Sequence, residues 1–165
     1  MANRKEYVPS LKETEVLADL SSWMGDQDQL LLLHDEDDRT SRNGSDSANF
    51  VSCIARFDAP IEDVRRQIQE YEQYPDHLAE LNRANVRDQT PDRTLVDYEF
   101  TVETPVLNPT FEYCLRYRET DEGDLVFEAV DGDFPNVLGR WEFFEQGDQT
   151  LVVYTVWYDM SNPGW

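Results

Sequence analysis

Four tyrosines and one histidine are the residues whose types could support proton transfer or hydrogen bonding to a bound molecule. Tyr74, Tyr98, Tyr113 and Tyr117 can each donate a hydrogen bond from a phenol. His77 is the nearby side chain whose ordinary pKa lies close to neutral pH. Removing a proton beside a carbonyl requires such a base, and the developing enolate requires such donors. Tyr113 and His77 are therefore the candidates for catalysis.

A row of aromatic side chains is expected to line one face of a sheet. In residues 94–103 and 110–118, apolar and polar side chains alternate with period two, which predicts strands with one solvated face. Wide aromatic surfaces beside a few hydroxyls suit an apolar, ring-bearing ligand, although the same residues could simply fill a core. The candidate ligand-binding residues are Tyr74, Tyr98, Phe100, Phe111, Tyr113, Tyr117, Trp141 and Phe143.

Other kinds of reactive site find no support in the residue spacing. Cys53 and Cys114 lie far apart in the chain, and neither His34 nor His77 has a Cys or His at metal-ligand spacing. We therefore expect buried free thiols, no metal site and no cofactor. No Ser-His-Asp or Cys-His arrangement can be argued from the order of the residues, and the sequence contains no phosphate-binding loop motif.

The charge balance is strongly acidic. The 165 residues include 35 Asp and Glu against 14 Lys and Arg, which gives a formal charge of −21. Phosphate contacts need clustered basic side chains, so the chain is not expected to bind nucleic acid or anionic lipid. Because the carboxylates are scattered along the chain, we favour a solvated, self-repelling surface of the kind halophilic proteins carry. The alternative is an acidic patch for a basic partner.

No segment is expected to insert stably into a membrane. The longest aliphatic run, Leu30–Leu33, has the length of a strand and falls far short of the roughly 20 residues of a membrane-spanning helix. The N-terminus lacks the apolar region of a signal peptide. The sequence therefore predicts a cytoplasmic protein.

The chain is expected to divide into an N-terminal extension, 1–47, and a domain, 48–165. In the extension, a capping-box pattern at Ser10 and helical spacing of apolar residues predict a helix over 11–24. A short strand is expected at 30–33, followed by a polar loop to residue 47.

The domain is expected to begin with a strand and two short helices and to continue as sheet. After a strand at 49–57, Pro60 suits the first turn of a helix whose apolar stripe ends near Tyr71. Tyr74-Pro75 then interrupts the helix, and 76–81 is predicted to form a second short helix. Antiparallel strands are expected at 84–89, 94–103, 110–118, 124–130, 138–145 and 150–160.

Two segments carry a family resemblance that covers about 48–160. The stretch "FDAPIEDVRRQIQEYEQYPDHLAEL" (57–81) resembles the opening of START-like (SRPBCC) domains, with an alanine-proline before the first helix and an aromatic-proline pair after it. The stretch "DGDFPNVLGRWEFFEQGDQTLVVYTVWYDM" (131–160) resembles the polyketide cyclase/dehydrase and coenzyme Q-binding branch. The residues that match its Leu-x-Gly-x-Trp-x-Phe strand are Leu138, Gly139, Trp141 and Phe143.

The resemblance implies an α+β helix-grip fold, in which a curved antiparallel sheet wraps around a long C-terminal helix and leaves an apolar cavity. The sequence predicts no such lid helix after the last strand. A shortened chain, a lid from another copy in a homo-oligomer, or helix 11–24 in its place would each explain this. Aromatase/cyclase relatives place arginine inside, whereas Arg116 and Arg118 alternate out of phase with the inward tyrosines and are expected to face solvent.

Three functions remain open on this basis. The first is binding of a hydrophobic small molecule, such as a lipid, quinone or polyketide, as a carrier or chaperone. The second is a polyketide cyclase/dehydrase-type enzyme that uses tyrosine and His77. The third is a protein-interaction module whose acidic surface is the working part, because fold alone does not decide function.

Overall fold

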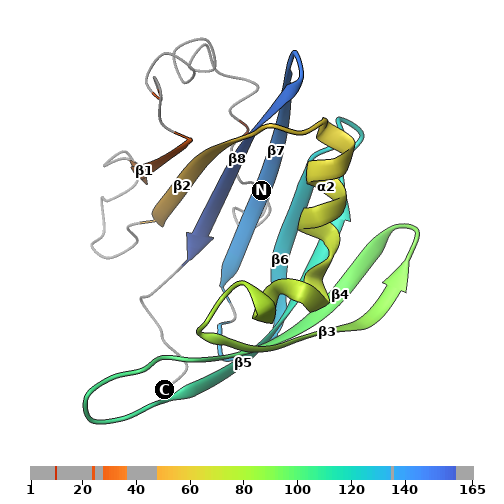
Figure 1. Ribbon diagram of the computed structural model, residues 1–165. Coiled ribbons are helices and arrows are strands. Elements are labelled where there is room, and N and C mark those ends of the chain that lie inside the picture. Colours follow the sequence, from red (N-terminus) through yellow and green to blue (C-terminus); the bar gives the residue numbers. More distant parts are fainter. Residues whose placement is uncertain (1–9, 11–23, 25–27, 37–47, 135, 159–165) are drawn as a thin grey trace, which may run out of the picture.

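The described residues form an eight-stranded antiparallel sheet, and the helical segments α2 and η3 lie on one face of it (Figure 1). The computed structural model describes residues 10, 24, 28–36, 48–134 and 136–158. Its strands are β1 (Gln29–Glu36), β2 (Ala48–Phe57), β3 (Leu81–Thr90), β4 (Arg93–Thr101), β5 (Thr110–Glu119), β6 (Leu125–Gly132), β7 (Val137–Gln146) and β8 (Gln149–Tyr158). The helical segments are α2 (Ile61–Gln69) and the 3₁₀ helix η3 (Tyr71–Asp76).

The strand order is β1-β2-β8-β7-β6-β5-β4-β3. Strands β3 to β8 follow one another as hairpins, so each pairs with the next along the chain. The segment from β2 to β3 instead crosses from one part of the sheet to the other edge, and α2 and η3 form this crossing. The sheet curves around them, as Figure 1 shows. We call the side of the sheet that faces α2 and η3 the inner face and the opposite side the outer face.

Helix α2 begins and packs as the sequence predicts. Pro60 is its N-cap, and Glu62 and Asp63 lie in the first turn, where the helix dipole favours negative charge. Val64 is buried in the core, and Ile61 and Ile68 pack against it. The apolar stripe therefore holds α2 against the inner face.

The expected second helix at 76–81 is wrong. The chain forms the 3₁₀ helix η3 immediately after α2, and Pro75 lies inside it. Burial decides this, because Tyr71 packs against Tyr117 with ring centroids 4.4 Å apart and the Tyr74 hydroxyl donates to the Ile68 carbonyl. Strand β3 then begins at Leu81, three residues earlier than expected.

The predicted alternation of the middle strands is confirmed. Buried residues of the inner face come from every second position of β4 to β8 and meet α2 and η3 in one core. At its end, β4 stops at Thr101, two residues before the expected boundary, and Val102 is 39% exposed. The residues at the centre of the core are Val64, Tyr71, Leu81, Ala84, Val96, Tyr98, Leu115, Tyr117, Leu125, Phe127, Phe143 and Val152.

The N-terminal extension contributes strand β1, which pairs antiparallel with β2. The predicted helix 11–24 lies outside the described residues except for Met24, which is buried. Ser10 is also buried, and its hydroxyl donates to Oε1 of Glu142 over 2.5 Å. Glu142 alternates with Trp141 and Phe143 and therefore lies on the outer face. This contact gives no support to the hypothesis that 11–24 replaces the lid on the inner face.

A charged group accompanies Glu142 on the outer face. Asp124 and Glu142 are fully buried, and Arg140 lies between them. Arg140 Nη2 is 2.7 Å from Asp124 Oδ2, and Arg140 Nε is 3.9 Å from Glu142 Oε1. Removing one member of such a group would leave an uncompensated charge in the interior, so we expect all three to be needed together.

Candidate functional site

The residues predicted to bind a ligand converge on the inner face from different elements. Tyr98 and Phe100 of β4 lie opposite Tyr113 and Phe111 of β5 in register. Tyr74 of η3 stacks over Tyr98, with ring centroids 6.4 Å apart. The curvature of the sheet and the position of η3 thus bring together side chains that are distant in the sequence.

Three of the tyrosines fill the core where η3 meets the sheet. Tyr71, Tyr98 and Tyr117 are each at most 5% exposed. The hydroxyls of Tyr98 and Tyr117 are 2.9 Å apart and form a buried hydrogen bond. This pair therefore satisfies its own polar atoms and links β4 to β5, while the rings of Tyr71 and Tyr74 pack η3 against the same two tyrosines.

One group of half-buried aromatic rings lies at one end of the inner face. Phe100, Phe111 and Tyr113 surround Phe134, with ring centroids 5.5, 5.2 and 5.8 Å from it. Phe134 was not among the sequence candidates. It lies in the Gly-Asp-Phe-Pro turn after β6, and the Gly-x-Phe signature of that turn was the signal that could have identified it.

A second half-buried group lies on β7 and β8. Trp141 contacts Tyr154 with ring centroids 4.3 Å apart, and the buried ring of Phe127 on β6 stacks on Tyr154 at 5.9 Å. Tyr154 and Phe127 were also missing from the sequence candidates. The alternation of Val152, Tyr154 and Val156 in the last strand would have placed Tyr154 on this face.

The remaining candidates lie at the margins of these two groups. Phe143 is buried, and the guanidinium carbon of Arg65 lies 5.2 Å from its ring centroid. His77 is exposed at the C-terminal end of η3. The inner face therefore offers phenols and aromatic rings. His77 is exposed to solvent, whereas these rings are buried or half-buried.

The phenols of this face are protonated at neutral pH. Burial raises the pKa of Tyr113 to about 12. Burial also raises the pKa of Tyr154, and the neighbouring phenols of Tyr113 and Tyr74 raise it further. A phenol in this state donates a hydrogen bond but does not remove a proton. The chemistry that the described residues support is apolar contact together with hydrogen-bond donation.

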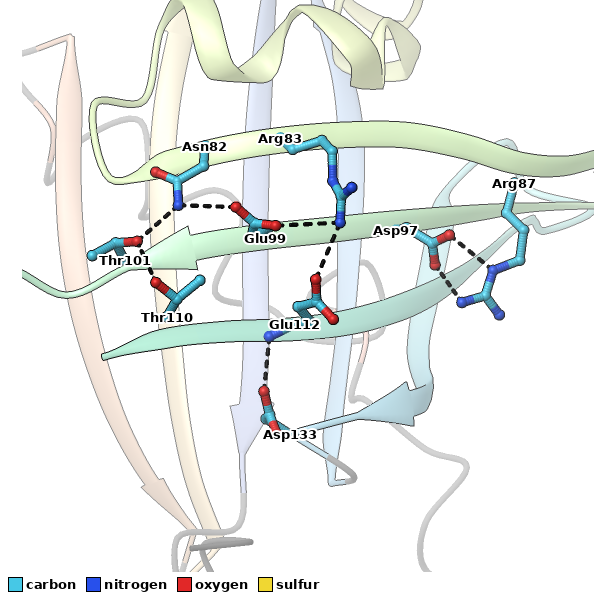
Figure 2. A network of polar contacts seen from close by, with 9 residues as sticks. All are labelled: Asn82, Arg83, Arg87, Asp97, Glu99, Thr101, Thr110, Glu112 and Asp133. Atoms are coloured by element: carbon cyan, nitrogen blue, oxygen red, sulfur yellow. Dashed lines mark hydrogen bonds and ion pairs between the residues drawn. The ribbon is translucent and has the colours of Figure 1, made fainter. Parts of the chain in front are cut away.

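The outer face of β3 to β6 is polar instead. Figure 2 shows Arg83 reaching Glu99 and Glu112, at 3.3 and 3.2 Å, and Arg87 pairing with both oxygens of Asp97. Arg83, Arg87, Asp97 and Glu112 are among the residues that line a groove of about 330 Å³. Its cations and carboxylates already compensate one another, so this face does not suit an apolar ligand.

Cys114, Arg116 and Arg118 belong to this outer face. Cys114 is buried beside the groove, and burial raises the pKa of its thiol to about 11, so the thiolate is scarce at neutral pH. Cys53 is a free thiol as well, but it is only partly buried. Arg116 and Arg118 both pair with Glu128, so they point away from the inner face as the sequence predicts.

The family model for polyketide cyclase/dehydrase and lipid transport proteins matches residues 57–165. The chain belongs to this family. Among curated proteins, none matches the chain significantly. The match covers α2, η3 and the six strands that follow, which are the elements that build the aromatic inner face. The resemblance to START-like domains inferred from the sequence is thus confirmed.

Solved structures share the fold of this family member. The protein TTHA0849 from Thermus thermophilus is 24% identical, with 68% of this chain and 75% of that chain covered at a TM-score of 0.60. A STAR-related lipid transfer protein from Xanthomonas axonopodis is 15% identical, with 76% and 75% covered at 0.56. The Zhui aromatase/cyclase from Streptomyces sp. R1128 is 12% identical, with 67% of each chain covered at 0.57. At these identities the likeness establishes the fold alone.

Two further observations concern the described part of this polyketide cyclase/dehydrase and lipid transport domain. No described helix is both long and apolar enough to cross a bilayer. Among the described residues, no three His, Cys, Asp or Glu side chains are grouped so that they could hold a metal ion.

Proposed function

We propose that the protein binds a hydrophobic small molecule on the inner face of the sheet, beneath α2 and η3, and acts as its carrier or chaperone. The observation that carries this proposal is the half-exposure of Phe100, Tyr113, Trp141 and Tyr154. In a core that was filled for stability alone, rings at the middle of a sheet would be buried like Tyr98. Here they present apolar surface that a ligand could remove from water.

The driving force for such binding is the removal of the apolar surface of these rings from water. Removing apolar surface from water contributes roughly 25 cal/mol per Å². Burying about 100 Å² of the protein's own aromatic surface would thus add about 2.5 kcal/mol before the costs of association. The rings contact one another at 4.3 to 5.9 Å, so they are held in place before a ligand arrives.

A cyclase/dehydrase-type activity is the second candidate function, because the family and the fold also include aromatase/cyclases. The Tyr113 phenol would serve as a donor to a developing enolate, and His77 would have to serve as the base. Tyr113 meets its part of this requirement, but its raised pKa keeps it from acting as a base itself. The exposure of His77 favours binding over catalysis as the first proposal.

Native mass spectrometry tests the proposal directly. The protein is incubated with a fatty acid, a phospholipid and a ubiquinone analogue, and retained mass is measured after gel filtration. We expect at least one class to be retained at one molecule per chain. Trp141→Ala should reduce retention, since the indole forms part of the apolar surface.

The matched control is Phe144→Ala, on the same strand but on the outer face. It should leave retention unchanged once thermal melts show that both variants are folded. Binding on the inner face would be refuted if no probe is retained, or if Trp141→Ala and Phe144→Ala reduce retention equally. The alternative would then be that the acidic surface contacts another protein. Turnover of a poly-β-ketone that is lost in His77→Ala would instead support the enzyme.

A further inference from the structure

The loop between β4 and β5, residues 102–109, presents two aliphatic side chains to solvent, and we call it the tip loop. Val106 is 85% exposed and Leu107 is 71% exposed. The other exposed large apolar side chains among the described residues reach only 39 to 52%. Figure 1 shows the tip loop at the end of the β4–β5 hairpin, which extends beyond the neighbouring strands. Single exposed apolar side chains are common, whereas two adjacent ones on a projecting hairpin can leave water together.

The tip loop is held in shape by its own polar groups. The Leu107 N–H donates to Thr104 Oγ1 over 3.0 Å, and the Thr104 hydroxyl donates to the Leu107 carbonyl. The Thr104 N–H donates to Oδ1 of Asn108, and the Val102 N–H donates to the Pro109 carbonyl. These groups keep their partners when water is removed, which lowers the cost of bringing the loop into an apolar phase.

The apolar tip is bounded by charge only at its base. Residues 104–111 contain no charged side chain, although 30% of the chain is charged. Glu103 comes directly before this stretch and Glu112 directly after it, and both are exposed. Together with the formal charge of −21, these carboxylates would repel an anionic surface. The tip therefore suits an apolar phase whose surface carries no net charge.

The small area of the tip favours a lipid surface over a protein partner. A standard protein interface buries about 800 Å² on each partner, which is far more than two aliphatic side chains can supply. A bilayer sets no such minimum, because it acts as a solvent and the affinity grows with the apolar area that enters it. Two side chains support shallow, reversible contact rather than stable insertion.

We propose that the tip loop docks the protein reversibly on a lipid surface without net charge, such as a phosphatidylcholine bilayer, by inserting Val106 and Leu107. Phe100 precedes the loop and Phe111 follows it, and their ring centroids are 5.2 Å apart. Docking would therefore bring the end of the inner face that carries Phe134 close to the membrane. The inference goes beyond the proposed binding function and does not depend on what the inner face binds.

Sedimentation with sucrose-loaded phosphatidylcholine vesicles tests the inference on the full chain. We expect the wild-type protein to bind, and Val106→Ser and Leu107→Ser each to weaken the partition coefficient about 3- to 10-fold, since each removes an apolar side chain that leaves water. The double variant should weaken it about 10- to 100-fold. Replacing about a third of the lipid by phosphatidylglycerol should weaken binding at low salt, and about 1 M KCl should remove that difference.

Phe57→Ser is the matched control, because Phe57 is 42% exposed at the opposite end of the sheet, where β2 ends and β8 begins. Its partition coefficient should stay within about 2-fold of the wild-type value, as should that of Leu107→Ile, which keeps the apolar area. Thermal melts check that each variant is folded.

Three results would overturn the inference. The first is wild-type protein that does not sediment with phosphatidylcholine vesicles. The second is a double variant that binds like the wild type, or Phe57→Ser weakening binding as much as the double variant does. The third comes from analytical ultracentrifugation without lipid: a dimer that dissociates in the Val106→Ser/Leu107→Ser variant would show that the tip covers a second copy of the chain instead.

Discussion

Gly139→Ala tests how closely the aromatic floor of the inner face is packed. A Cβ at Gly139 would lie 1.8 Å from Cζ of Phe127 and 2.3 and 2.5 Å from Cε1 and Cε2. Carbon atoms in contact are normally about 3.5–4.0 Å apart, so the ring would have to retreat by about 2 Å. The centroid of the Phe127 ring lies 5.5 Å from that of Tyr117 and 5.9 Å from that of Tyr154, so these two rings limit how far it can move.

The expected cost follows from two opposing terms. Forcing an extra methyl into a packed core costs about 1–3 kcal/mol. Replacing glycine by alanine lowers the entropy of the unfolded chain, which returns about 0.4–1 kcal/mol because Gly139 does not have a left-handed backbone. We therefore expect the free energy of unfolding of Gly139→Ala to fall by about 1–2 kcal/mol.

Urea unfolding, followed by circular dichroism, measures this change in the free energy of unfolding. Repeating the measurement in a Phe127→Leu background tests whether the Phe127 ring causes it. In the Phe127→Leu background the smaller side chain leaves room for the methyl, so Gly139→Ala should cost less than about 0.5 kcal/mol there. Gly147→Ala is the control. Gly147 has φ +64° and nothing within 4 Å of a Cβ, so its cost should come from the backbone alone and be the same in both backgrounds. An equal cost of Gly139→Ala with and without the Phe127 ring would refute the packing argument.

Three further outcomes are expected. Tyr98→Phe should lower the free energy of unfolding by about 1–3 kcal/mol because it leaves the buried Tyr117 hydroxyl unpaired, whereas Tyr98→Phe/Tyr117→Phe should recover most of that loss in the same urea assay. Unfolded tyrosine ionises above about pH 10, whereas the pKa of Tyr113 in the folded protein is about 12. The free energy of unfolding should therefore fall as the pH rises from 10 through the folded pKa of Tyr113, by up to about 1.4 kcal/mol per pH unit for that phenol. Tyr113→Phe should make this dependence on pH less steep. The charge of −21 should make the midpoint of thermal unfolding rise between about 0.05 and 1 M KCl as repulsion is screened, and an unchanged midpoint would contradict a self-repelling surface.

The order of the elements could be predicted from the sequence because each depends on local patterns. Alternation with period two placed β4 and β5 and their inner-face aromatic residues, and Pro60 with the apolar stripe placed α2. The same alternation put Arg116 on the outer face. These features need only the neighbouring residues, so no knowledge of the fold was required to find them.

The error at 76–81 had a tertiary cause. A proline after an aromatic residue suggested a break between two helices, but η3 runs through Pro75 because Tyr71 gains a buried contact with Tyr117 of β5. The local preference of the chain was outweighed by the burial of a ring against a strand distant in the sequence.

The sequence by itself determined an antiparallel sheet with an aromatic face and a polar face, since strand alternation sorts side chains into two faces wherever the strands finally lie. Only the tertiary structure decided which aromatic residues fill the core and which remain half-exposed. Tyr98 and Tyr117 satisfy each other, whereas the hydroxyl of Tyr113 finds no partner among the described residues, although all three are predicted from the sequence to face inward. The physical reason is that exposure and hydrogen bonding depend on how η3 and the curvature of the sheet bring distant strands together.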